Sequence, residues 1–150
     1  MTGLADNQLE LLRALARHGV EFVVVGGVAA QLHGWDGATV DLDIAVSTDE
    51  SNVERLNRAL LSVAAGPPVI GGLGSVFQTR FGRLEVVRRA DGIGDYAAWA
   101  QNAGEHVVDE QLTVVVAAPA DILRSKEAAG RAKDHAALPA MRDAFRNSGA

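Results

Sequence analysis

The 150-residue sequence contains no cysteine. Disulfide bonds and thiolate-bound metal sites are therefore excluded, and nothing follows about the redox state of the compartment. No apolar run approaches the roughly 20 residues that a transmembrane helix needs. The N-terminal stretch MTGLADNQLE also lacks a basic region followed by an apolar core. These absences predict a cytoplasmic protein with no membrane partner.

Positive charge is scarce relative to negative charge. The chain has 14 lysine and arginine residues against 19 aspartate and glutamate residues, a formal net charge of −5. A broadly basic surface for nucleic acid is therefore not expected. Aromatic residues make up only 5% of the chain, and no base-reading element or aromatic stacking platform is evident. Two local basic clusters remain, which are Arg80, Arg83, Arg88 and Arg89, and then Arg124, Lys126, Arg131 and Lys133.

The rest of the composition is that of an ordinary globular domain, and we expect one domain over residues 1–150. Hydrophobic spacing and helix breakers predict helices at residues 6–18, 28–33, 51–64, 95–102, 121–129 and 133–145, the last kinked or interrupted at Pro139. Strands are expected at residues 22–25, around Asp41 and Asp43, and at 75–80, 83–88, 105–108 and 111–116. Residues 71–74 are expected to form a flexible loop. In the helix at 51–64, the expected buried stripe is Val53, Leu56, Leu60 and Leu61.

The most informative stretch runs from residue 22 to residue 46. An apolar, β-branched run ends at Gly26 and Gly27, where the missing side chains would let an anion approach the backbone amides. Further on, Asp41 and Asp43 stand two residues apart, so they share one face of a strand. Adjacent carboxylates repel each other unless a cation lies between them, and carboxylate oxygens suit Mg²⁺ or Mn²⁺. A phosphate cradle beside such a metal site is what phosphoryl or nucleotidyl transfer requires.

Either half of this pattern is weak evidence alone, since Gly-Gly pairs are common in turns and D-x-D is common at surfaces. Together and in order, two glycines, thirteen residues and then Asp-Leu-Asp-Ile resemble the signature of the DNA polymerase β-type nucleotidyltransferase superfamily. The resemblance implies that Asp41 and Asp43 bind metal and that Gly26 and Gly27 bind the nucleotide. Thr39 shares the face of Asp41 and could touch a phosphate, or could simply begin the strand.

The same resemblance implies a third carboxylate on a later strand beside the D-x-D strand. Glu85 is the one acidic residue placed to supply it, although aspartate is the more frequent choice. The alternative is that Glu85 faces solvent on the uncovered side of the sheet. The sequence also departs from the family at Gly37, where many members have an arginine.

A second resemblance covers the C-terminal part of the chain. Asp121, Lys126, Arg131, Lys133 and Asp134 follow a spacing that looks like the closing motif of the AbiEii-like nucleotidyltransferases, a group that includes toxins of toxin–antitoxin systems. The resemblance implies that Lys126 and Arg131 lie near the nucleotide phosphates, with Asp134 orienting them. The alternative is an ordinary charged helix face with paired side chains one turn apart.

These observations lead to one expected fold and three candidate functions. The fold should be α/β, a nucleotidyltransferase-type mixed sheet of about four to six strands with helices mainly on one face. The leading function is Mg²⁺-dependent transfer of a nucleoside monophosphate from an NTP to a hydroxyl. In this interpretation the protein is a toxin-like enzyme that acts on RNA such as tRNA, with a possible antitoxin partner. The alternatives are a small-molecule transferase of the aminoglycoside type and a catalytically inactive relative that serves as a binding module.

Overall fold

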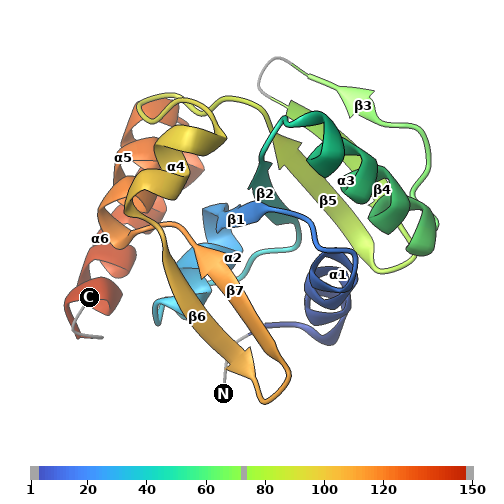
Figure 1. Cartoon of the computed structure of the whole chain (residues 1–150). Helices are drawn as coiled ribbons and strands as arrows, with labels where there is room; N and C mark the ends of the chain where they lie inside the picture. The colour runs from blue at the N-terminus through green and yellow to red at the C-terminus, as the bar shows by residue number, and fades with distance from the viewer. Residues whose placement is uncertain (1–3, 72–73, 148–150) are drawn as a thin grey trace.

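The structure is a computed structural model that describes residues 4–71 and 74–147. The helices in these residues are α1 (Asp6–Arg17), α2 (Gly26–Leu32), α3 (Glu50–Ser62), α4 (Tyr96–Asn102), α5 (Pro119–Ala129) and α6 (Ala132–Asn147). The strands are β1 (Phe22–Val25), β2 (Leu42–Val46), β3 (Val69–Ile70), β4 (Gly74–Thr79), β5 (Gly82–Val87), β6 (Gly104–Asp109) and β7 (Leu112–Val116). Figure 1 shows their arrangement.

The seven strands form one mixed sheet in the order β3-β4-β5-β2-β1-β7-β6. β2 pairs antiparallel with β1 and parallel with β5, and β1 pairs parallel with β7. The prediction of a mixed α/β fold is confirmed, but the count of four to six strands was too low. The missed strand is β3, whose two residues are both exposed, so it has no alternation of buried and exposed positions that could have revealed it.

Helices lie on both sides of the centre of this sheet and not mainly on one face as predicted (Figure 1). On one side, Leu11 and Leu15 of α1 and Leu60 of α3 lie together with Leu84 of β5. The other side is bordered by α4, α5 and the beginning of α6, which gather at one end of the sheet (Figure 1). All four residues of β1 are buried between these layers, as expected for a short β-branched strand in the middle of a sheet.

Three details of the predicted helices and loops differ in the structure. α2 begins at Gly26 rather than at Val28, so the glycine pair forms the first turn of the helix. α6 continues through Pro139 without an interruption. Of the expected loop at 71–74, residues 72 and 73 lie outside the described residues, and Gly74 already belongs to β4. A Cβ on Gly74 would lie 2.4 Å from the Val86 carbonyl oxygen, so only glycine lets these two strands approach so closely.

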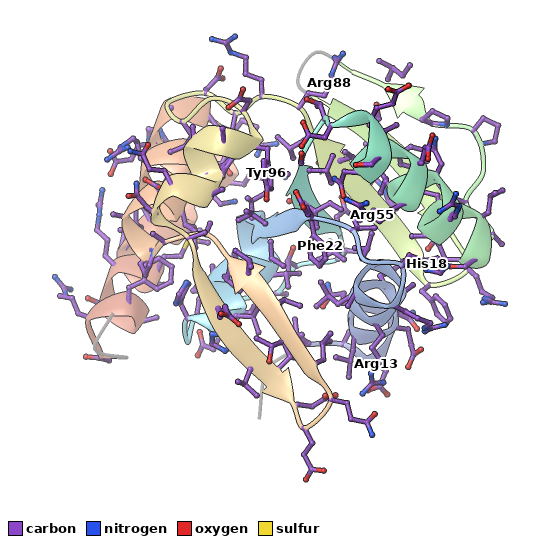
Figure 2. The ribbon with its side chains drawn as sticks, viewed as in Figure 1. Arg13, His18, Phe22, Arg55, Arg88 and Tyr96 are labelled. Atoms are coloured by element: carbon purple, nitrogen blue, oxygen red, sulfur yellow. The ribbon has the colours of Figure 1, made fainter. Side chains whose placement is uncertain are left out.

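Two long-range contacts tie α1 to the rest of the fold. Arg13, which Figure 2 labels, pairs with Asp109 at the end of β6, with a nitrogen–oxygen distance of 2.5 Å. The buried Gln8 donates from Nε2 to the carbonyl oxygens of Thr39 and Val40, each at 3.2 Å. α1 therefore holds the backbone immediately before the carboxylate strand. In the described part of the chain, no helix is both long and apolar enough to cross a membrane.

Candidate active site

The sheet register places two of the predicted acidic residues side by side. β2 and β5 run parallel, with Asp43 directly opposite Glu85 and Leu42 directly opposite Leu84. Because side chains alternate between the faces of a strand, both leucines are buried on the side of α1 and α3, while both carboxylates face the other side. Glu85 is therefore the neighbour of Asp43 and does not stand alone on an uncovered face.

The Asp43 side chain is half-buried and lies in an unfavourable environment. Burial and the nearby carboxylates of Glu85 and Asp41 raise the pKa of Asp43 to about 7. Its Oδ1 atom is buried and has no hydrogen-bond partner among the described residues. Gly26 has a φ of +67°, and a Cβ on it would lie 2.4 Å from Asp43 Oδ2. The first glycine of the pair is thus required both by its backbone conformation and by the space that Asp43 occupies.

Asp41 occupies a different environment from Asp43. Its Oδ2 lies 3.7 Å from Nη1 of Arg83, which stands two residues before Glu85 on β5. The Asp41 side chain is about 28% exposed, and it is not one of the described residues that line the cavity next to Asp43. The two aspartates of the D-x-D pattern are therefore near each other, but Asp41 is turned towards an arginine.

Asp43 and Glu85 lie on the wall of a cavity of about 310 Å³, a volume at the lower end of the usual range for ligand sites. The cavity is bounded by the end of β1, by β2, β5 and the chain after β5, by α4 and α5, and by the beginning of α6. Its lining residues are Val25, Gly26, Asp43, Glu85, Val87, Arg89, Ala90, Asp91, Trp99, Ser125, Lys126, Ala129, Arg131 and Asp134.

Two cations of this cavity are held by one buried aspartate. The Asp134 side chain is fully buried; Lys126 Nζ lies 3.2 Å from its Oδ1, and Arg131 Nε lies 2.6 Å from its Oδ2. Burial alone would raise the pKa of Asp134, but the hydrogen bonds from Arg131 and Lys126 hold it below its usual value. The structure therefore brings together the lysine, arginine and aspartate of the C-terminal motif, on the side of the cavity formed by α5 and α6.

The remaining predicted nucleotide contacts have structural roles. A Cβ on Gly27 would lie 2.7 Å from Thr39 Oγ1, so Thr39 packs directly against this glycine. Neither residue belongs to the described residues that line the cavity. At Gly37, a Cβ would lie 1.9 Å from the Trp35 ring. The indole of Trp35 thus fills the space where an arginine at position 37 would begin.

Sequence reasoning missed three cavity residues that could bind a ligand, which are Arg89, Trp99 and Ser125. An aromatic side chain such as Trp99 on an amphipathic helix usually packs in the core, so its sequence position gives no signal of a binding role. Trp99 is 2% exposed, and its indole Nε1 is buried without a hydrogen-bond partner in the described part of the structure. Leaving such a donor unpaired costs about 1–3 kcal/mol.

A divalent cation at this site would need oxygen ligands from the acidic side chains around Asp43. Within residues 4–71 and 74–147, no group of three or more His, Cys, Asp or Glu side chains converges in a geometry that could hold a metal ion. A pair of carboxylates remains, in which the Asp43 Oδ1 atom is unpaired and the negative charges repel each other. Hard cations bind oxygen ligands of this kind and complete their shells with water or substrate phosphates. The pair formed by Asp43 and Glu85 therefore fits such an ion.

We compared the sequence and the structure with known proteins. No family model matches the sequence, and no curated protein matches it. The structure is similar to that of the lincosamide antibiotic adenylyltransferase LnuA bound to lincomycin, with a TM-score of 0.67 and 11% identity over 94% of this chain and 98% of that chain. It is also similar to an antigenic nucleotidyltransferase-like protein from Paracoccidioides brasiliensis, with a TM-score of 0.54 and 20% identity over 90% of this chain and 74% of that chain. The chain therefore has the nucleotidyltransferase fold.

Proposed function

We propose that the protein transfers a nucleoside monophosphate from an NTP to a hydroxyl group with the help of a divalent cation. One observation carries this proposal: a single cavity has a half-buried carboxylate pair on one wall and two cations held by a buried aspartate on another. The first wall suits a metal ion, and the second suits a phosphate chain. Nucleotidyl transfer needs both within the reach of one substrate.

Each cavity residue has a distinct task in this proposal. Asp43 and Glu85 would hold Mg²⁺ or Mn²⁺, and Asp41 would join them only by giving up its contact with Arg83. When bound, the ion would neutralise charge on the transferred phosphoryl group. Glu85 would also orient the attacking hydroxyl or accept its proton. Lys126 and Arg131 would bind the phosphates of the leaving group, and the glycine at position 26 would let the phosphates approach the backbone.

For the acceptor we favour a small hydroxylated molecule. The net charge of −5 disfavours a long polyanion. In addition, nearly the whole chain superposes on nearly the whole of an enzyme whose acceptor is a small antibiotic. An RNA acceptor such as tRNA, with an antitoxin partner, is the second candidate. It is supported by the C-terminal motif, whose Lys126, Arg131 and Asp134 come together in the structure as that resemblance implies.

The test is transfer of label from each α-³²P-labelled NTP in the presence of Mg²⁺. Two acceptor pools are supplied separately: a panel of lincosamide and aminoglycoside antibiotics, and total tRNA. We expect label on a small molecule and none on tRNA. Label on tRNA alone would support the second candidate. If the protein binds no NTP in a calorimetric titration and labels neither pool, nucleotidyl transfer is excluded and a binding module remains.

Replacing Lys126 by alanine is expected to weaken Mg·NTP binding by at least about tenfold. A charge-assisted contact with a phosphate contributes about 1.5–3 kcal/mol, and each 1.4 kcal/mol corresponds to a tenfold change in affinity. AMP binding should change far less, because AMP lacks the β- and γ-phosphates. The variant should also melt at a lower temperature, since the buried Asp134 loses one of its two cations. Calorimetric titration and thermal melting check these results.

The matched control is Lys133→Ala, which removes an exposed lysine on the neighbouring helix α6. It should leave both the affinity and the melting temperature unchanged, because exposed substitutions of this kind are usually near neutral. Equal loss of NTP affinity in the two variants would mean that general charge, rather than the contact of Lys126 with phosphate, is responsible.

A further inference from the structure

Trp99 is a buried hydrogen-bond donor that faces no acceptor in the described structure. Its indole is 2% exposed and lines the same cavity as Asp43 and Glu85. The indole N–H can only donate, and buried tryptophans normally have a partner for it. Because Trp99 lines the cavity, a ligand bound there is one source of the missing acceptor.

The helix that carries Trp99 is fixed at both ends. At its beginning, the Asp95 side chain accepts a hydrogen bond from the Ala98 backbone N–H at 3.3 Å. At its end, Asn102 donates to the buried Asp121 at 3.2 Å. α4 thus holds the indole in one orientation. A binding group that is already ordered loses little conformational entropy when the ligand binds.

The surroundings of Trp99 indicate which atom it binds. Val87, Ala90 and Ala129 line the same cavity, and the Trp99 Nε1 atom itself is shielded from solvent, so bulk water does not compete for this N–H. α4 packs against β1, which is followed directly by Gly26, beside the expected path of the phosphates. Phosphoryl oxygens are strong, charged acceptors, and the cations Lys126 and Arg131 line the same cavity.

We propose that Trp99 donates its indole N–H to a phosphoryl oxygen of the bound nucleoside triphosphate, and is thus a substrate-binding residue. This assignment rests on the proposed function. It assigns chemistry to a residue whose type and position on a short helix suggest only packing. It also predicts that Trp99 distinguishes triphosphate from a ligand without phosphates.

The first test is binding of two probes, Mg·NTP and Mg·tripolyphosphate, measured by calorimetry. Trp99→Phe keeps an aromatic ring and removes the N–H, and we expect it to weaken both probes by about tenfold. The control is Tyr96→Phe, which removes a polar group at the beginning of the same helix (Figure 2). Tyr96 is not among the described residues that line the cavity. Tyr96→Phe should bind both probes as the wild type does.

The second test does not depend on the stability of the Trp99→Phe variant. The chain has two tryptophans, Trp35 and Trp99, so Trp35→Phe leaves Trp99 as the reporter in an intact cavity. We expect saturable changes in its emission with both probes. Unchanged emission alongside calorimetric binding, or equal affinities in the wild type and Trp99→Phe, would overturn the assignment and leave the proposed function standing. Weakening of Mg·NTP alone would also overturn it, since the contact would then be with the nucleoside. If the wild type binds neither probe, the assignment and the proposed function both fail.

Discussion

Replacing Glu85 by glutamine is expected to lower the rate of nucleotidyl transfer by about 10²- to 10⁴-fold, the range typical for removal of a positioned general base. The side chain stays the same size but can no longer accept a proton or contribute a charged ligand oxygen. NTP affinity should stay within about threefold of the wild-type value, because in the proposed function the phosphates are bound mainly by Lys126 and Arg131, which line the cavity. Label transfer under single-turnover conditions, with calorimetric binding in parallel, measures the two effects separately.

The matched control for this variant is Glu105→Gln, which neutralises an exposed glutamate on β6 away from the cavity. It should transfer label at the wild-type rate. Near-wild-type turnover by Glu85→Gln would remove Glu85 from the proposed mechanism, even though it lies directly opposite Asp43 in the sheet.

Replacing Asp43 by asparagine is expected to stabilise the metal-free protein at pH 8 by about 2–4 kcal/mol. The folded-state pKa of Asp43 is raised from 3.8 to about 7. Between these values the folded protein holds a proton that the unfolded chain has released, so wild-type stability falls as the pH rises from about 4 to about 7. Asparagine does not titrate, and this part of the pH dependence should disappear. Thermal melting from pH 4 to pH 8 in the presence of a chelator checks the result.

Two comparisons complete this experiment. Asp36→Asn, which changes an exposed loop aspartate, should keep the full wild-type pH dependence. Added Mg²⁺ should raise the melting temperature of the wild type at pH 8 and should hardly affect Asp43→Asn, because a ligand stabilises only the state that binds it. An identical response to Mg²⁺ in both proteins would place the metal elsewhere.

The sequence was most informative about which face of a strand each side chain occupies, because residue chemistry and strand geometry both restrict that placement. The two-residue periodicity of strands placed Leu42 and Asp43 on opposite faces, and the same rule separated Leu84 from Glu85. The two-residue periodicity could not predict that β2 pairs with β5, because the register depends on contacts between segments about 40 residues apart. For Glu85, the resemblance to the nucleotidyltransferase signature implied a position on a strand beside the D-x-D strand. In the structure, Glu85 lies opposite Asp43 on the neighbouring strand.

Side chains that take their partners from distant segments could not be predicted. In α3, Val53 and Leu61 were expected to be buried, yet they are 38% and 79% exposed, while Asn52 is fully buried. Asn52 donates to the carbonyl oxygen of Ser47 at 2.8 Å and accepts from the Glu21 backbone N–H at 2.7 Å. These bonds to two separate loops satisfy the amide in the interior. Hydrophobic spacing alone does not reveal such bonds, so the helix is rotated relative to its expected orientation.

The same limit applies to the candidate site. Nothing in the D-x-D pattern indicated that Asp41 would lie against Arg83 or that Trp35 would cover Gly37. Both contacts involve side chains that the spacing of motif residues leaves undetermined. By contrast, the resemblance to the closing motif implied the cluster of Lys126, Arg131 and Asp134, which forms across the short turn between α5 and α6.

The parallel pairing of β1 with β7 has a consequence for how the chain folds. Val24 pairs with Val116, about 90 residues later in the chain, and contacts of such separation slow folding because a long loop must close first. Domains generally begin to fold from the N-terminal end during synthesis. Asp43 and Glu85 therefore emerge before the segment that supplies Lys126 and Arg131, and the nascent sheet must hold two repelling carboxylates until the last helices arrive. Lys126 favours the charged form of Asp43, so this cationic segment, which is made last, reduces the repulsion that the nascent sheet has to bear.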